Sequence, residues 1–262
     1  MALPDLLVLP PRSAKPRRAG LTHVLDRGMP LADVEALLGV AGEHIDIWKL
    51  AWGTAYLDPQ VACKVAILRE QAIAACVGGT LLEVAWVQGR SERLLDWAAE
   101  TGFDCVEVSN GARRMTLLDK RRLIERAAAR FTVLAEVGAK QADAPVRARA
   151  WADEAAGDLE AGATWVVAEG RESGTVGIYS ADGRVRPELV EALLRATRHR
   201  LIAEAPRKDQ QAWFIRRLGP DANLGNVVPA EVLGLEALRL GLRADTMDLS
   251  CGDEEMPAAA GP

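Results

Sequence analysis

Charged and polar side chains stand at the ends of several short apolar segments of this 262-residue sequence. Carboxylates supply the oxygen ligands that Mg²⁺ prefers, whereas lysine and arginine bind anions or donate protons. As a set, these residues indicate one polar pocket that binds a divalent cation and an anionic ligand. For any single carboxylate, a salt-bridged structural role is an equally good interpretation. The segment ends supply Asp26, Lys49, Glu107, Ser109, Glu136, Lys140, Glu169, Arg171 and Glu204.

Histidine and cysteine offer little alternative chemistry. His23, His44 and His199 lie inside or at the start of predicted strands, where a structural role is more usual than a catalytic one. They form no Ser-His-Asp set. The four cysteines show no C-x-x-C spacing, so neither a zinc site nor a disulfide framework is indicated. We expect reduced thiols in a cytoplasmic protein.

One pattern repeats along the chain: a short apolar or β-branched segment, a polar end, and then an amphipathic helix. This alternation predicts βαβ units and a parallel sheet. Eight such units in 262 residues fit one (β/α)₈ barrel, for which about 250 residues are typical. The carboxyl ends of the strands, with their charged residues, then meet at one face. The predicted strands are 21–26, 44–50, 72–77, 104–109, 131–137, 163–169, 200–205 and 222–227.

Glycine-rich stretches after two of these strands are candidates for anion binding. Loops after the seventh and eighth strands of such barrels commonly bind phosphate through backbone N–H groups. A tight turn is an equally good interpretation of Gly78-Gly79. The candidate substrate-binding residues are Gly78, Gly79, Thr80, Ser109, Lys208, Gln210, Asn223 and Gly225.

The two ends differ from the middle. Residues 1–19 form an arm with a basic patch, which we expect to be solvated, although it could reach an anion site. Residues 20–250 form the predicted catalytic barrel, and 251–262 read as a disordered acidic tail. The basic residues of the arm are Arg12, Lys15, Arg17 and Arg18.

Composition excludes several classes of protein. Apolar residues make up 49% and charged residues 26%, which is ordinary for a soluble globular chain. A net charge of -5 gives no reason to expect nucleic acid as a partner. No run of 18 apolar residues predicts a membrane span, and the first residues lack the pattern of a signal peptide. We also expect a homo-oligomer.

A series of motifs, in this order, resembles the phosphosulfolactate synthase family over roughly residues 20–246. As a set they are far more specific than any one alone. The motifs are GLTHVLDRG (20–28), DIWKLAWGT (46–54), VGGTLLE (77–83), VEVSNG (106–111), LAEVGAK (134–140), EGRESG (169–174), EAPRKDQQ (204–211), NLGN (223–226) and LEALRLGLRADT (235–246).

The resemblance implies a (β/α)₈ barrel that adds sulfite to phosphoenolpyruvate with Mg²⁺, giving (2R)-phospho-3-sulfolactate. In methanogens this reaction opens coenzyme M biosynthesis. Lys140 matches the proposed general acid/base, and Lys49 and Arg171 match further basic residues of the family. On this basis we expect Lys49, Arg171 and the last-strand loop to hold phosphate and sulfite. The expected Mg²⁺ ligands are Glu136, Glu169, Glu204 and Asp26.

The sequence departs from the family pattern near these residues. Ala139 replaces the first lysine of E-V-G-K-K, Asn110 replaces the aspartate of S-D-G, and Ala51 and Ala55 flank the conserved part of G-W-G-T-S. One alternative is therefore a related barrel enzyme with another nucleophile or another enolpyruvyl or phosphorylated substrate. The other is a non-catalytic stress or interaction barrel, which the retained basic residues and strand-end carboxylates disfavour.

Overall fold

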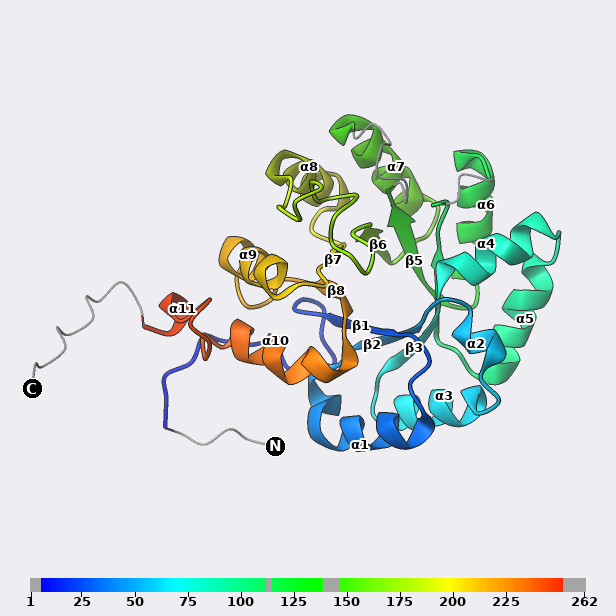
Figure 1. The fold of residues 1–262 in the computed structure, drawn as a ribbon. Coiled ribbons are helices and arrows are strands. Elements are labelled where there is room, and N and C mark those ends of the chain that lie inside the picture. Colours follow the sequence, from blue (N-terminus) through cyan, green and yellow to red (C-terminus); the bar gives the residue numbers. More distant parts are fainter. Residues whose placement is uncertain (1–5, 112–114, 139–146, 252–262) are drawn as a thin grey trace, which may run out of the picture.

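The computed structural model describes residues 6–111, 115–138 and 147–251 as a closed barrel of eight parallel strands paired in chain order (Figure 1). Each predicted strand is confirmed, shorter by one to three residues than expected, and so is the (β/α)₈ architecture. The strands are β1 (Thr22–Asp26), β2 (Ile47–Leu50), β3 (Ala74–Val77), β4 (Cys105–Val108), β5 (Thr132–Val137), β6 (Trp165–Ala168), β7 (Leu201–Glu204) and β8 (Leu224–Val227).

Helices surround the barrel (Figure 1). Local signals set several of their ends: Thr116 and Asp119 form a capping box, and Gly102 ends a helix in the left-handed conformation. No helix in the described part of the chain is both long and apolar enough to cross a membrane. The helices are α1 (Leu31–Ala41), α2 (Thr54–Leu57), α3 (Val61–Glu70), α4 (Gly79–Val87), α5 (Ser91–Thr101), α6 (Leu117–Ala128), α7 (Ala148–Glu160), α8 (Pro187–Thr197), α9 (Lys208–Leu218), α10 (Val232–Arg239) and α11 (Asp248–Cys251), with short 3₁₀ turns at Gly42–His44 and Pro229–Glu231.

The barrel interior has an apolar layer beneath a charged one. Side chains two residues apart in a strand share a face, so an inward apolar residue is followed inward by the residue two positions later. The apolar layer is Leu21, Ile47, Cys76, Cys105, Leu134, Val167 and Ile202. On five strands the residue two positions further is charged, and each is at least 94% buried: Lys49, Glu107, Glu136, Glu169 and Glu204.

A buried ammonium holds two outer helices against the end of β5. Lys120 of α6 is fully buried, and its Nζ donates to the backbone oxygen of Glu136 (2.7 Å), to Glu154 (2.7 Å) and to Asp158 (2.6 Å). Burial opposes the charge, but Asp158 and Glu154 outweigh it and raise the pKa of Lys120. This hydrogen bond from the outer helix holds the backbone of Glu136, which belongs to the charged layer, in place.

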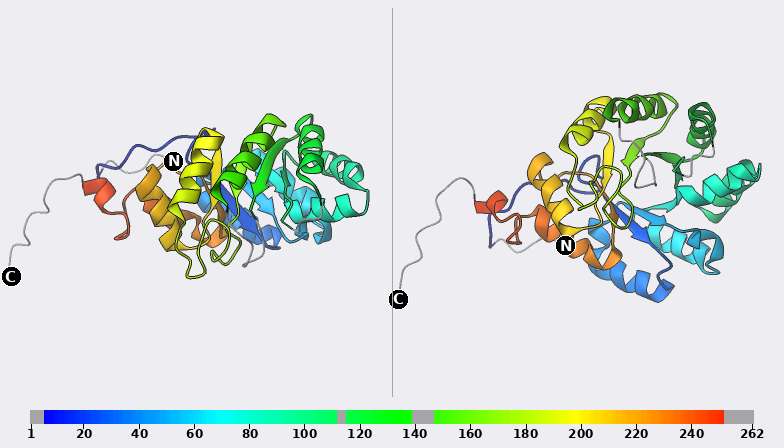
Figure 2. Two further views of the ribbon diagram at one scale, coloured as in Figure 1. Left: turned by 90° about the horizontal axis from the view of Figure 1, so that it is seen from above. Right: turned by 45° about the horizontal axis from the view of Figure 1, so that its top comes forward.

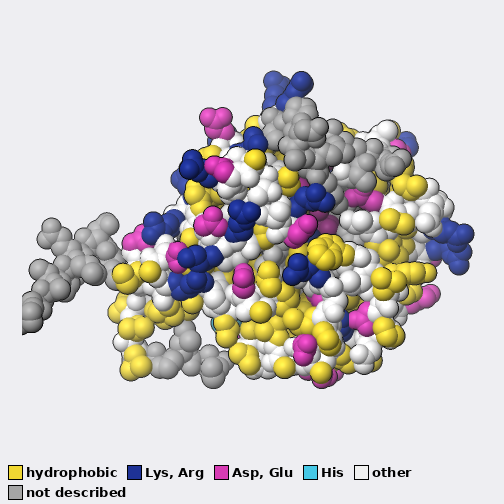
Figure 3. Space-filling model, viewed as in Figure 1, with side chains coloured by type: hydrophobic (Ala, Val, Ile, Leu, Met, Phe, Trp, Pro, Cys, Tyr) yellow, Lys and Arg dark blue, Asp and Glu magenta, His cyan; other side chains and the backbone are white. Residues whose placement is uncertain are grey.

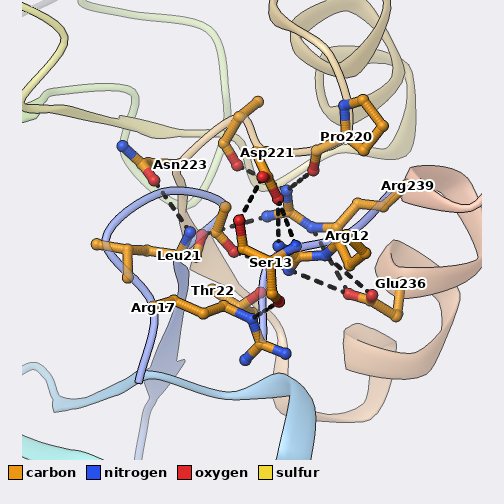
Figure 4. Close-up of polar contacts among 12 residues, drawn as sticks. Arg12, Ser13, Arg17, Leu21, Thr22, Pro220, Asp221, Asn223, Glu236 and Arg239 are labelled. Atoms are coloured by element: carbon orange, nitrogen blue, oxygen red, sulfur yellow. Dashed lines mark hydrogen bonds and ion pairs between the residues drawn. The ribbon is translucent and has the colours of Figure 1, made fainter. Parts of the chain in front are cut away.

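The N-terminal arm docks against residues that precede β2 and β8, at the end of the barrel opposite the charged layer, contrary to the solvated arm that we expected. Figure 4 shows these contacts. Arg12 donates to Asp221 (2.8 Å) and Glu236 (3.0 Å), and Arg17 donates to Asp46 (3.2 Å). In Figure 2 the blue arm accordingly runs beside the orange and red C-terminal elements. Because these carboxylates occupy its arginines, the arm is a structural clamp rather than an anion site.

Removal of Arg12 tests this clamp. Arg12→Ala removes the hydrogen bonds that Arg12 donates to Asp221 and Glu236, so we expect the free energy of unfolding in urea to fall by about 1.5–3 kcal/mol. Arg18 of the same arm is exposed, and Arg18→Ala should change it by less than about 0.5 kcal/mol. Equal effects of the two substitutions would contradict a docked arm.

Candidate active site

The charged layer forms the floor of a cavity of about 600 Å³ at the carboxyl ends of the strands. Figure 3 shows acidic and basic side chains interspersed with hydrophobic ones over the face seen in Figure 1. Six glutamates and two basic residues line the cavity, together with apolar groups from α4 and the β2 loop. The charged lining residues are Lys49, Glu83, Glu107, Glu136, Glu169, Arg171, Glu172 and Glu204.

Lys49 lies at the centre of this floor. Its Nζ is 2.9 Å from Glu107 Oε2 and 3.2 Å from Glu204 Oε1. Burial alone would lower the pKa of Lys49, but Glu107, Glu204 and Glu136 outweigh it and raise the pKa well above the usual value. Lys49 is therefore a fixed cation in this state and not a proton donor near neutral pH.

The loop after β6 supplies backbone donors to two glutamates. The N–H groups of Gly170 and Arg171 both donate to Glu204 Oε2 (2.9 Å each), and that of Arg171 also donates to Glu169 Oε1 (2.9 Å). Arg171 adopts a left-handed backbone (φ 56°), which is uncommon outside glycine. That backbone aims one N–H at two carboxylates and leaves the Arg171 side chain on the cavity wall.

The start of α4 meets the floor from the β3 side. Gly79 N–H donates to Glu107 Oε1 (3.0 Å), and Lys49, with this bond, holds the pKa of Glu107 below its usual value despite burial. A Cβ on Gly79 would lie 2.5 Å from Ser109 Oγ, so only glycine permits this approach. Ser109 donates a short hydrogen bond to Glu83, which also accepts from Gly111 N–H.

Three of the glutamates can share a cation. Oxygens of Glu107, Glu136 and Glu204 all lie within 4.8 Å of one another, and all three side chains are buried. Oxygen-only donors of this kind suit Mg²⁺ rather than a softer metal.

Comparison with known proteins places the chain in a family. Residues 10–245 match the family described as (2R)-phospho-3-sulfolactate synthase (ComA). The chain is 41% identical over 248 residues to the phosphosulfolactate synthase of Methanothermobacter thermautotrophicus, covering 91% of this chain and 95% of that protein. The Bacillus subtilis phosphosulfolactate synthase is 38% identical, with 93% and 98% covered. The chain belongs to the phosphosulfolactate synthase family.

Solved structures with little sequence similarity share the fold alone. A 3-hexulose-6-phosphate synthase from Salmonella typhimurium superposes with a TM-score of 0.56 at 13% identity, covering 83% of this chain and 97% of that one. The YdjI aldolase from Escherichia coli gives a TM-score of 0.55 at 13% identity, covering 90% and 93%. The predicted membership of the phosphosulfolactate synthase family is confirmed by the family match and the two close relatives.

The structure brings eight of the predicted site residues to the cavity. Lys140 lies outside the described residues, so its predicted role is untested. Ser109 does not line the cavity but donates a hydrogen bond to Glu83, which does. The eight that line the cavity are Lys49, Gly78, Gly79, Thr80, Glu136, Glu169, Arg171 and Glu204.

Asp26 was expected among the metal ligands, but its carboxylate is engaged elsewhere. Oδ1 accepts from the N–H groups of Gly28 and Met29 (2.7 Å each), and Oδ2 accepts from Trp48 Nε1 (3.0 Å) and lies 3.6 Å from Lys64 Nζ. These donors fix the turn after β1. Asp26 is not among the residues that line the cavity, and we assign it a structural role.

Three residues of the expected phosphate site are also placed elsewhere. Asn223 precedes β8 rather than ending it, and its side chain bonds Leu21 N–H and the Leu201 carbonyl. Lys208 is half exposed and pairs with Asp245 at 2.7 Å. Gly225 faces the barrel interior below the cavity, since a Cβ there would lie 2.8 Å from His23 Nδ1.

Sequence reasoning missed other lining residues. Glu107 was noted at a strand end but not proposed as a ligand, although its strand position is equivalent to that of Glu136. Trp52, at the cavity mouth, has a left-handed backbone (φ 55°) and lies beneath the Arg27 guanidinium, 5.2 Å from the ring centre. Asn226 lines the cavity next to the expected Gly225. Only the strand periodicity could have identified Glu107.

His23 is a neutral group buried beside the charged floor. It is fully buried, and neither ring nitrogen has a hydrogen-bond partner among the described residues. Burial, and secondarily the positive charge of Lys49, lowers its pKa from 6.5 to about 3. An imidazole in the unfolded chain titrates near its ordinary value, so the folded protein resists protonation of His23.

This difference predicts a pH dependence of stability. The folded pKa is below the unfolded one, so the contribution is complete above about pH 6.5 and is lost as the pH falls toward about 3. As the pH falls from about 7 to about 5.5, His23 becomes protonated in the unfolded chain only. We expect this to lower the free energy of unfolding by about 1 kcal/mol. Urea denaturation of His23→Leu should show a shallower pH slope than wild type. His199→Leu changes an exposed histidine and should keep the wild-type slope; a wild-type slope in both variants would refute the assignment.

Proposed function

We propose that this member of the phosphosulfolactate synthase family adds sulfite to phosphoenolpyruvate with Mg²⁺, giving (2R)-phospho-3-sulfolactate. The observation that carries the proposal is the charge of the cavity. Six glutamates face two basic side chains in its described lining, and oxygens of three of these glutamates lie within 4.8 Å of one another. Two anionic substrates can enter such a cavity only with an additional cation.

The donor set of the floor fits Mg²⁺. The ligands we propose are Glu136 and oxygens of Glu107 and Glu204, which lie within 4.8 Å of one another, together with Glu169, which lines the same cavity. Bound Mg²⁺ would supply Lewis acidity at the carboxylate of phosphoenolpyruvate. Asp26 is left out because its oxygens are occupied.

The chain itself must bind the anions and deliver a proton. Sulfite sulfur bonds to C3, the C2=C3 bond opens, and the charge spreads onto the carboxylate as an enediolate. A general acid then protonates C2. Under this proposal, Lys49 remains charged throughout and stabilises this anion electrostatically, and Arg171 and the Thr80 hydroxyl, which line the cavity, bind phosphate or sulfite oxygens.

Lys140 is the acid that we propose, on its match to the family lysine. Gly138 follows β5 and is the last described residue before Lys140. A Cβ on Gly138 would lie 2.4 Å from the Cβ of Glu169, which lines the cavity. The chain therefore leaves β5 against a wall of the cavity, two residues before Lys140.

One of the departures from the family pattern has a local explanation. The amide of Asn110 donates to the Met115 carbonyl (2.7 Å) and accepts from Met115 N–H (3.2 Å), so it closes a loop. Asn110 is not among the residues lining the cavity. This placement removes one of the two reasons to propose a different substrate; the other, Ala139, lies outside the described residues.

The direct test is incubation of the protein with phosphoenolpyruvate, sulfite and Mg²⁺, with products read by mass spectrometry. We expect phosphosulfolactate, and no product when sulfite is omitted or the metal is chelated. Consumption of phosphoenolpyruvate without sulfite would indicate the related enzyme with another nucleophile. No turnover with any nucleophile would support the non-catalytic barrel.

The metal ligands are tested by a matched pair of substitutions. Glu136→Gln removes a charge from the shared oxygen cluster, so the Mg²⁺ concentration for half-maximal activity should rise at least about tenfold. Glu172 lines the cavity outside that cluster, and Glu172→Gln should leave the Mg²⁺ dependence within about twofold of wild type. An identical shift in both variants would mean a general charge effect rather than coordination.

The proposed acid is tested by Lys140→Met, which keeps the bulk of the side chain and removes its proton. General acid catalysis is worth about 10²–10⁴-fold, so kcat should fall by that order. If Lys140 only holds an anion, KM for phosphoenolpyruvate or sulfite should rise while kcat is spared. An unchanged kcat would therefore remove Lys140 as the acid, and circular dichroism checks that the variant folds.

A further inference from the structure

The pairing of β8 with β1 is irregular beside the cavity. Thr22 pairs with Leu224 and Val24 pairs with Val227, so two steps along β1 match three along β8. The additional residue on β8 forms a β-bulge at Gly225 and Asn226. Bulges bend a strand and re-aim side chains, and they are frequent at the rims of barrels.

The bulge changes the direction of the Asn226 side chain. Gly225 faces the interior, since a Cβ there would contact His23 Nδ1 (2.8 Å) and Ile202 Cγ2 (3.0 Å). In a regular strand, the next residue would face the outer helices. Asn226 instead lines the cavity, with a left-handed backbone (φ 54°) and 4% of its surface exposed.

Two unfavourable features coincide at Asn226. A left-handed backbone costs free energy in any residue but glycine, although asparagine tolerates it better than most. In addition, the buried Oδ1 has no hydrogen-bond partner among the described residues. Arg171, the corresponding left-handed residue after β6, gains two bonds from its N–H to carboxylates. Asn226 has no such compensation within the described chain. After rotation of the amide, its NH₂ group can obtain one by donating to an acceptor oxygen of a ligand in the cavity.

We propose that Asn226 is a substrate-positioning residue whose side-chain amide donates a hydrogen bond to an anionic oxygen of phosphoenolpyruvate, which rests on the proposed function. The register sets Gly225 opposite Glu204, so the amide stands beside one of the carboxylates that would repel this substrate. The two ends of an amide are nearly equal in size, so rotation can present the NH₂ group to the anion. A neutral donor on this wall holds the substrate without adding to the charge.

Two substitutions separate the amide from the backbone. Asn226→Gly removes the amide and accepts the left-handed conformation without strain, so the melting temperature should be unchanged or higher. Asn226→Asp keeps the shape and replaces the donor with a negative charge. In isothermal titrations with phosphoenolpyruvate and Mg²⁺ but no sulfite, we expect Kd to rise about 10- to 100-fold for glycine, and further for aspartate. Gln88 is an exposed amide at the cavity rim, and Gln88→Ala serves as the control with an expected change below about twofold.

The outcomes distinguish this proposal from the proposed function. An unchanged Kd in Asn226→Gly overturns the role of Asn226, and tighter binding of Mg²⁺ and substrate by Asn226→Asp overturns it in favour of a metal ligand. Another outcome is that the wild-type protein binds phosphoenolpyruvate and Asn226→Gly fails to bind it, while the wild-type protein forms no product with sulfite. In that case the binding role stands and the proposed reaction fails. A wild-type chain that does not bind phosphoenolpyruvate overturns both.

Discussion

The ion network of Lys49 is the interaction on which the site depends. Its ammonium lies 2.9 Å from Glu107 and 3.2 Å from Glu204, at the centre of a layer that contains four buried glutamates. A buried charge is stable only when it is paired and hydrogen-bonded. Lys49 and the N–H groups of Gly79, Gly170 and Arg171 provide these partners. Without them the glutamates would take up protons or force the barrel open.

Strand periodicity explains why so much of this arrangement could be predicted. On five strands an inward apolar residue, such as Ile47 or Leu134, is followed two positions later by an inward charge, Lys49 or Glu136 in these two cases. A sequence shows that spacing directly, and a closed parallel barrel brings all the strand ends to one face. The fold, the family and eight of the proposed site residues therefore follow from local patterns.

Two residues departed from expectation for different reasons. Asp26 ends β1 but pairs with Leu50, whereas Leu25 pairs with the inward-facing Lys49, so strand alternation applied to β1 would have excluded Asp26. The N–H groups of Gly28 and Met29 bind its carboxylate instead. Asn226 would face outward by simple alternation and is turned inward by the bulge. Such a one-residue change in register is not encoded in residue type or spacing.

The charge of the cavity also constrains how ligands bind. Lys49 cannot be the cation for an incoming anion without loosening its bonds to Glu107 and Glu204, because both carboxylates already use its positive charge. Under the proposed function, Mg²⁺ reduces the repulsion between the glutamates and phosphoenolpyruvate, and the substrate in turn adds oxygen ligands and negative charge to the metal site. By linkage, each ligand strengthens the binding of the other by the same factor. A cavity with an excess of carboxylates is thus suited to bind metal and anion as a pair and to hold the anion only weakly alone.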